Sequence, residues 1–188
     1  MDDIILIALE KEAPNLANKP GVFLTGVGKV AAAITAAKLI EKYKPKRVFN
    51  FGTAGGINVA HGNIYKCSKF TQRDFFVSGC LISQDRFDLY DSIMFVNSRD
   101  GLHLSTGDNF VTDPASANGA DLVDMEAYAI ARACEEADDP TIEFFCYKYV
   151  SDAADENAAD HFKDNIHKGE EHYFDVLKQH GITFDHEQ

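Results

Sequence analysis

Acidic side chains follow apolar segments of this chain at the points where those segments end. Glu12 comes just after the apolar run 3–9, and Ser151 and Asp152 follow the aromatic run 143–150. In open α/β sheets, ligands bind beyond the carboxyl ends of the strands. These carboxylates could therefore meet in one crevice and perform acid–base chemistry there. The alternative for Ser151 and Asp152 is the start of a polar loop.

Two glycine-rich turns also follow apolar runs. GVGK at 26–29 is no Walker phosphate loop, because Val30 takes the place of the required Ser or Thr, and no dinucleotide fingerprint, because Ala31 replaces the third glycine. It predicts either a tight strand-to-helix turn or a backbone cradle close to a ligand. GTAGG at 52–56 leaves the same alternatives open, and the hydroxyl of Thr53 could form one hydrogen bond to a ligand.

A third acidic motif, VDMEAYAIA at 123–131, lies at the predicted start of a helix. Asp124 would make a fair N-cap, and acids in a first turn interact favourably with the helix dipole. Met125 could simply be a core residue. The other interpretation is that Asp124, Met125 and Glu126 face a ligand.

The elements that must position these residues alternate between strands and helices. Strands are expected at 3–9, 21–25, 47–51, 91–98 and 143–150, and helices at 29–43, 126–137 and about 157–179. In the helix at 29–43, Ile34, Ala37 and Ile40 recur at helical spacing, which predicts an apolar face. The alternation predicts one domain, 1–188, with a three-layer α/β/α architecture around a largely parallel, mixed sheet.

Composition narrows the class of protein. The chain has 188 residues, 45% of them hydrophobic, which suits a single compact domain. It contains no run of about 18 apolar residues, so no membrane span is expected, and its opening MDDIILIALEKE does not resemble a secretory signal. A net charge of −12 argues against nucleic-acid binding, whereas an uncharged small molecule is an easier partner.

The cysteines show no CxxC spacing and no nearby histidine pair. They are Cys67, Cys80, Cys134 and Cys146. We expect reduced thiols and a cytoplasmic protein. No metal and no cofactor are suggested by the sequence.

An ordered set of segments is far more specific than any single motif. Its members are LIALEKEA (6–13), TGVGKVAAA (25–33), NFGTAGGI (50–57), STGDNFV (105–111), LVDMEAYAIA (122–131) and YVSDAAD (149–155). Together they resemble the purine nucleoside phosphorylase/nucleosidase superfamily, and most closely the methylthioadenosine/S-adenosylhomocysteine nucleosidases. The resemblance implies a nucleoside phosphorylase-like fold that is shortened in the middle.

The resemblance also implies roles for the acidic residues. Glu12 would orient and deprotonate an attacking water, and Asp152 would protonate the purine N7 with support from Ser151. Glu126 would accept hydrogen bonds from the ribose 2′- and 3′-hydroxyls, with Met125 packed beside the sugar. Such a reaction passes through an oxocarbenium-like state, which nearby carboxylates stabilise.

Four further positions match the family pattern or depart from it slightly. By resemblance, Phe110 would stack on the purine and the backbone of Val111 would bond its edge. Thr53 would place a hydroxyl near the nucleophile. Asp124 replaces a Glu of the ribose-side motif and is one methylene shorter.

The choice between hydrolysis and phosphorolysis depends on whether the site contains a cationic side chain that can hold phosphate. Bacterial phosphorylases of the superfamily carry an Arg that holds phosphate where this chain has Asn50, and the segment 13–25 contains no Arg. An anionic nucleophile without a cationic partner would be poorly held. The resemblance therefore favours water as the nucleophile.

Other departures concern the substrate's 5′ side. The region 60–105 is shorter than in the family, and Lys148 stands where the nucleosidases have an Arg. Within that region, Arg73-Asp74 and Asp85-Arg86 could contact substrate, although surface ion pairs are the expected interpretation.

Three functions thus stay open. The leading one is hydrolysis of an adenine-type nucleoside, and the alternatives are a phosphate-dependent purine nucleoside phosphorylase and an inactive nucleoside-binding protein. Retention of Glu12, Glu126 and Asp152 together argues against the last, since binding alone does not require all three. By resemblance, the chain is expected to form a homodimer.

Overall fold

The computed structural model describes residues 1–75, 94–95 and 100–184. Its strands are β1 (Asp3–Ile7), β2 (Val22–Leu24), β3 (Arg47–Gly56), β4 (Ile64–Gln72), β5 (Met94–Phe95), β6 (Leu102–Thr106), β7 (Leu122–Asp124) and β8 (Glu143–Asp152). Its α-helices are α1 (Lys29–Tyr43), α3 (Ala127–Glu135), α4 (Ala158–Asn165) and α5 (Glu170–Gln179), and two short 3-10 helices cover Glu10–Glu12 and Pro114–Ala117. None of the helices in these ranges is both long and apolar enough to cross a membrane.

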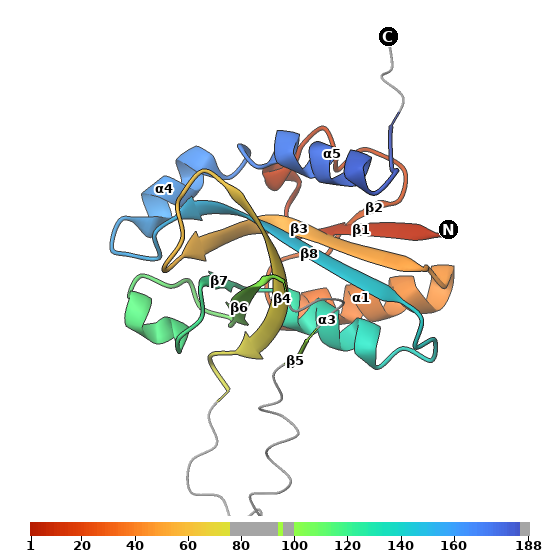
Figure 1. Cartoon of the computed structure of the whole chain (residues 1–188), viewed down its shortest axis with the longest axis horizontal. Coiled ribbons are helices and arrows are strands. Elements are labelled where there is room, and N and C mark those ends of the chain that lie inside the picture. Colours follow the sequence, from red (N-terminus) through yellow and green to blue (C-terminus); the bar gives the residue numbers. More distant parts are fainter. Residues whose placement is uncertain (76–93, 96–99, 185–188) are drawn as a thin grey trace, which may run out of the picture.

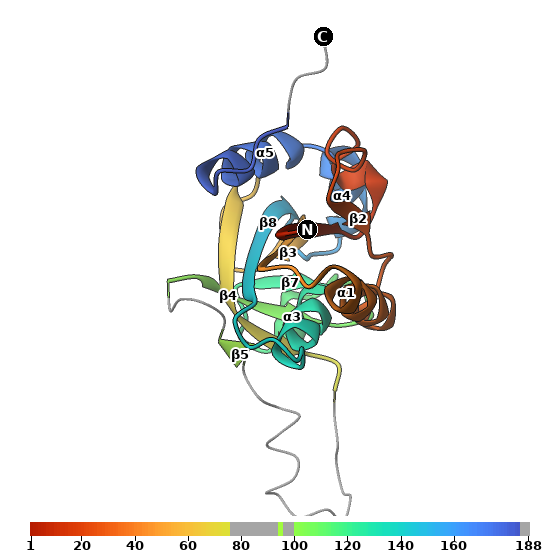
Figure 2. The same ribbon diagram turned by 90° about the vertical axis from the view of Figure 1, so that its right-hand side faces the viewer.

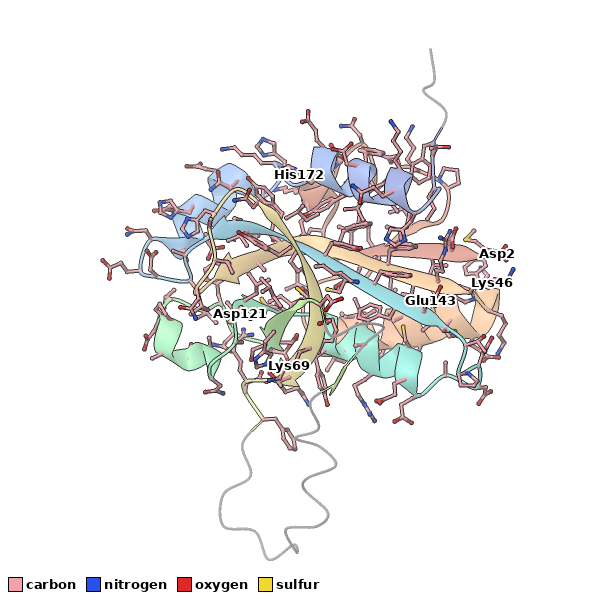
Figure 3. The ribbon with its side chains drawn as sticks, in the orientation of Figure 1. Asp2, Lys46, Lys69, Asp121, Glu143 and His172 are labelled. Carbon is pink, nitrogen blue, oxygen red and sulfur yellow. The ribbon has the colours of Figure 1, made fainter. Side chains whose placement is uncertain are left out.

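The elements form three layers. Helices α1 and α3 cover one face of the sheet, while α4 and α5 lie on the opposite face (Figure 1). The expected α/β/α architecture is therefore confirmed. Figure 3 shows Asp2, Lys46 and Glu143 near the end of the sheet where β1, β3 and β8 begin, so these three parallel strands all run toward the other end.

The sheet is mixed and closes on itself. Strands β2, β1, β3 and β8 pair in parallel, and β8 also pairs antiparallel with β4. Strand β4 continues through β6 to β7, and β7 returns antiparallel to β3 (Figures 1 and 2). This ring brings the carboxyl ends of β3, β7 and β8 together.

Two apolar cores lie on the two faces of the sheet. One packs α1 and α3 against the sheet and includes Leu6, Ile40 and Ile130. The other packs α5 against the sheet, where Phe51 stacks on Tyr173 with 4.9 Å between ring centroids. Burial on both faces explains why β1 and β3 are almost continuously buried and do not alternate between apolar and polar residues.

The bounds of α1 match the prediction, but its expected apolar face is wrong. Ile34 is 49% exposed and Ala37 is also exposed, whereas Ala32, Ala36 and Ile40 are the buried residues. The buried face consists mainly of alanines, which let α1 approach α3 closely. The helical spacing of Ile34, Ala37 and Ile40 therefore did not identify the buried face of α1.

The single helix expected at 157–179 is two helices. Helix α4 ends at Asn165 and α5 begins at Glu170. Gly169 lies between them, where a Cβ would come within 2.4 Å of the Tyr173 hydroxyl. The chain thus turns at a point of very close packing.

Other sequence-based expectations fall largely outside the described ranges. Of the strand expected at 91–98, the structure describes Met94–Phe95, which pairs antiparallel with β4. Asp85-Arg86 and Cys80 lie outside the described residues. The other three cysteines are buried and unpaired.

Two isoleucines of α1 provide a matched test of the packing. Ile40→Ala should lower the free energy of unfolding by roughly 2–5 kcal/mol, because Ile40 is buried and its truncation leaves a cavity. At a protein concentration at which the chain is monomeric, Ile34→Ala should change it by no more than about 0.5 kcal/mol, because that side chain is half exposed. Urea denaturation followed by circular dichroism measures both. Equal costs would contradict the assigned helix face.

Candidate active site

A cavity of about 230 Å³ opens at the carboxyl ends of the strands and the start of α3. Its lining includes every residue that the sequence assigned to the site. These are Glu12, Thr53, Phe110, Val111, Asp124, Met125, Glu126, Ser151 and Asp152. The expectation that the strand ends meet in one crevice therefore agrees with the geometry, while the individual roles stay predictions.

Glu12 is buried and held in one orientation by the protein. Its Oε1 accepts hydrogen bonds from the backbone N–H and the hydroxyl of Thr53, at 2.8 and 2.9 Å. Its Oε2 accepts from the backbone N–H of Leu9 at 3.0 Å. A Cβ at Gly52 would lie 3.0 Å from Glu12 Oε1, so glycine is needed for this close approach. The GTAGG segment, which is the end of β3 and not the predicted turn, thus holds a carboxylate in place.

Asp152 ends β8 at an irregularity in the sheet. Ala54 pairs with Val150 and Gly55 with Asp152, so the register passes over Ser151. Such a bulge changes the direction in which side chains point. Asp152 accepts hydrogen bonds from the Ser151 hydroxyl at 2.8 Å and from the Ala154 N–H at 2.9 Å. Burial raises the pKa of Asp152 above its ordinary value, despite these two donors.

Glu126 lies at the start of α3 and contacts the glycine turn GVGK at 26–29. Its Oε1 accepts the backbone N–H of Gly28 at 2.9 Å. Gly28 has a φ of +92°, which glycine adopts readily. Burial and then the charge of Asp124 raise the pKa of Glu126 to about 7. The GVGK turn is therefore both a strand-to-helix turn and a partner of a buried carboxylate.

The carboxylate of Asp124 is fully engaged by protein donors. Thr106 donates its hydroxyl to Oδ1 at 2.6 Å, and Ala127 donates its N–H to Oδ2 at 2.9 Å. Lys148 Nζ lies 3.0 Å from the same Oδ2, and both side chains are buried. The N-cap of α3 is Glu126 and not Asp124 as predicted, but Asp124 still accepts the N–H of the first helical residue and at the same time pairs with Lys148.

Aromatic side chains form the outer part of the cavity. Phe110 is 43% exposed and meets Phe162 edge-on, with 5.8 Å between ring centroids. Val111, the next residue, is buried. Phe110 is therefore available to stack on a flat ligand.

Several residues of the lining were not indicated by any pattern in the sequence. Phe162 comes from α4, and neither its spacing nor its type indicated that it faces the cavity. Asn109 and Val27 also line it. Arg73 was expected in a surface ion pair, which is wrong: it is 4% exposed, and its guanidinium donates to backbone carbonyls. Its position just beyond β4 is the signal that strand-end reasoning could have used.

Comparison with known proteins identifies the family of this chain. The sequence pattern of the family described as the phosphorylase superfamily matches residues 13–90 and 96–179. A 5′-methylthioadenosine/S-adenosylhomocysteine nucleosidase of Buchnera aphidicola is 32% identical over 173 residues, covering 77% of this chain and 73% of the relative. The enzyme of the same name from Shewanella pealeana is 29% identical, covering 89% and 83%. The chain therefore belongs to the phosphorylase superfamily and, within it, to the 5′-methylthioadenosine/S-adenosylhomocysteine nucleosidases.

Solved structures share the fold. A nucleosidase of the same name from Colwellia psychrerythraea, in complex with adenine, has a TM-score of 0.74 at 23% identity and covers 89% of each chain. A futalosine hydrolase mutant of Helicobacter pylori has a TM-score of 0.75 at 18% identity, covering 95% of this chain and 97% of its own. The nucleoside phosphorylase-like fold class is thus confirmed.

The raised pKa of Glu126 can be measured directly. NMR of the ¹³C-labelled carboxyl group should show Glu126 titrating near pH 7, and this resonance should be absent from Glu126→Gln. In Asp124→Asn, the pKa of Glu126 should fall toward its ordinary value, because the loss of a neighbouring negative charge favours ionisation. A titration midpoint near 4.5 in the unmodified protein would contradict this account of the site.

Proposed function

We propose that the chain hydrolyses the N-glycosidic bond of an adenine-type nucleoside, such as methylthioadenosine, S-adenosylhomocysteine or a related nucleoside. The observation that carries the proposal is one cavity lined by the protein-held carboxylate of Glu12 and by the buried Asp152, whose pKa is raised. The names of its relatives support the adenine base.

Asp152 is the proposed general acid. Protonation of purine N7 converts the base into a neutral leaving group, a contribution of about 10²–10⁴-fold in rate. The raised pKa of Asp152 favours the protonated form that this step requires. Ser151 donates its hydroxyl to Asp152 and keeps the carboxyl group oriented.

Glu126 is the proposed ribose ligand, with Met125 beside the sugar. Its Oε1 is engaged by Gly28, whereas Oε2 has no protein donor within the described ranges and can accept from the ribose hydroxyls. In its ionised form, which predominates above its pKa of about 7, Glu126 would act together with Glu12 to stabilise the cationic sugar as the glycosidic bond breaks. Phe110 would stack on the purine and the backbone of Val111 would bond its edge.

Water is the proposed nucleophile, activated by Glu12. Of the lining residues that the structure describes, Arg73 is the only Lys or Arg, and its guanidinium already donates to carbonyls. The N–H and hydroxyl of Thr53, which could bind an anion, are occupied by Glu12. Asn50 is buried in the sheet, where its amide donates to Leu6 O. Phosphate would therefore meet carboxylates without a free cation, which disfavours the phosphorylase alternative.

Base release with and without phosphate tests the nucleophile. The protein should release adenine from methylthioadenosine or S-adenosylhomocysteine in phosphate-free buffer, and phosphate should not accelerate the reaction. Chromatography of the free base measures the rate, with adenosine, inosine and guanosine as further substrates. Strict dependence on phosphate, with a ribose 1-phosphate product, would establish the phosphorylase alternative instead.

Two isosteric substitutions test the acid and the base. Asp152→Asn and Glu12→Gln should each lower kcat by about 10²–10⁴-fold, because each removes one proton-transfer group. Asp160→Asn and Glu41→Gln are matched controls, since both carboxylates are exposed and paired only with neighbouring lysines. Full activity in both active-site variants would refute the assignment, and no activity in the unmodified protein would favour the nucleoside-binding alternative.

We also propose that the chain forms a homodimer through the exposed side of α1. Val30 is 70% exposed, Val27 and Ile34 are about half exposed, and Val27 also lines the cavity. A partner there would remove apolar surface from water beside the ligand site. The cytoplasmic location expected from the unpaired thiols likewise stays a prediction.

Light scattering after size-exclusion chromatography tests the dimer. The mass should be twice 20.8 kDa, and Val30→Asp should shift it toward the monomer. Ala159→Asp, at an exposed position of α4 on the opposite face of the sheet, adds the same charge and serves as the control. A monomeric unmodified protein at micromolar concentration would refute the proposal.

A further inference from the structure

The dipeptide Arg73-Asp74 has no part in the chemistry described above, yet its two side chains form many hydrogen bonds beside the cavity. Arg73 is almost fully buried and contributes to the lining. A buried guanidinium is costly unless its donors are satisfied. In Arg73 both Nη atoms have partners, while Nε is buried without one among the described residues, so the partners of the Nη atoms indicate the role of this side chain.

The guanidinium holds the backbone of the site in place. Nη1 donates to the carbonyl oxygens of Ser105 and Asp124, both at 2.7 Å. Nη2 donates to those of Gly107 and Asn109, at 3.0 and 2.6 Å. One side chain thus joins the end of β6, the end of β7 and the segment that leads to the base-side aromatic residue.

Close packing reinforces this arrangement. A Cβ at Gly107 would lie 2.9 Å from both Cγ and Cζ of Arg73, so the backbone of the segment rests directly on the guanidinium. Phe110, which follows, is half exposed and touches Phe162 only edge-on. Val111 packs in an apolar cluster on one side of Phe110, and the bond from Arg73 to the carbonyl of Asn109 holds the backbone on its other side.

Asp74 connects this arrangement to the glycine turn GVGK at 26–29. Its Oδ2 accepts the N–H of Asp108 at 2.7 Å, and its Oδ1 accepts from Lys29 Nζ. Asp108 Oδ1 in turn accepts the backbone N–H of Lys29 at 2.7 Å. Gly28, the neighbour of Lys29, donates to the ribose-side carboxylate of Glu126. The dipeptide therefore links the base side of the cavity to its ribose side.

We propose that Arg73 and Asp74 are positioning residues that set the affinity for the nucleobase, by fixing the Phe110–Val111 segment relative to the motif at Asp124. The inference rests on the proposed function in one respect, the placement of the base at Phe110 and Val111. Lysine cannot replace Arg73, because a single ammonium group does not present the planar fork that reaches several carbonyls.

Calorimetric titration with free adenine tests the proposal. Arg73→Lys should raise the Kd for adenine by about tenfold or more, the factor expected when one charged hydrogen bond is lost, while the stoichiometry stays near one. KM for the nucleoside should rise by more than kcat falls. Arg132→Lys is the matched control, because Arg132 lies on the surface of α3 and pairs with Glu135 and Glu136.

A merely structural role gives a different result. Misfolded protein lowers the stoichiometry at an unchanged Kd, and that outcome would overturn the proposal, as would an unchanged Kd at full stoichiometry. If Arg73→Lys does not fold, Asp74→Ala replaces it, with Glu41→Ala as control, because Asp74 is partly exposed and less costly to remove. Asp74→Ala should also raise the Kd, by roughly threefold or more, and an unchanged value would overturn the proposal.

The same titration separates this inference from the proposed function. An unmodified protein that binds adenine but releases no base from nucleosides would contradict the hydrolysis alone. An unmodified protein that does not bind adenine would overturn the positioning proposal.

Discussion

The buried ion pair between Lys148 and Asp124 is the interaction on which the site depends. Four carboxylates line one cavity, namely those of Glu12, Asp124, Glu126 and Asp152. Burial by itself lowers the pKa of Lys148, but the charges of Asp124, Glu126 and Glu12 outweigh it and raise the pKa above its ordinary value. The lysine thus stays charged, and this cation lets a strongly acidic chain gather carboxylates in a buried place. Removing one partner of such a pair would leave an uncompensated charge, which is strongly destabilising.

The other three carboxylates differ in their hydrogen-bond partners and in what surrounds them. Glu12 accepts three hydrogen bonds, which suits a fixed base. Glu126 is raised to a pKa of about 7 by burial and by Asp124. Asp152 sits at a bulge and has a raised pKa, which suits an acid. Acidic side chains of similar chemistry thereby acquire different tasks from their environments.

Glycine and small residues make this arrangement possible. Gly52 lets the strand pass beside Glu12 and Lys148, where a Cβ would lie 3.0 and 3.3 Å from their polar atoms. In the same strand, Thr53 donates its N–H and its hydroxyl to a protein carboxylate, that of Glu12. A fold shared with phosphorylases is thereby suited to water as the nucleophile, because the two donors of Thr53 and both Nη atoms of Arg73 are already engaged by protein oxygens.

Local pattern in the sequence determined much of this protein. It predicted the strands β1, β3 and β8, the bounds of α1 and the crevice at the strand ends, because apolar runs and glycine turns depend on neighbours in the chain. The ordered motifs, through their resemblance, named nine residues of the lining but neither Phe162 nor Arg73. Only the tertiary structure decided that Ile34 faces outward and that Arg73 is buried and donates to backbone carbonyls. It also decided that the carboxylate of Asp124 accepts a hydrogen bond from Thr106 and pairs with Lys148. Those facts follow from packing between segments far apart in sequence, and no local pattern records which distant backbone or charge a side chain will meet.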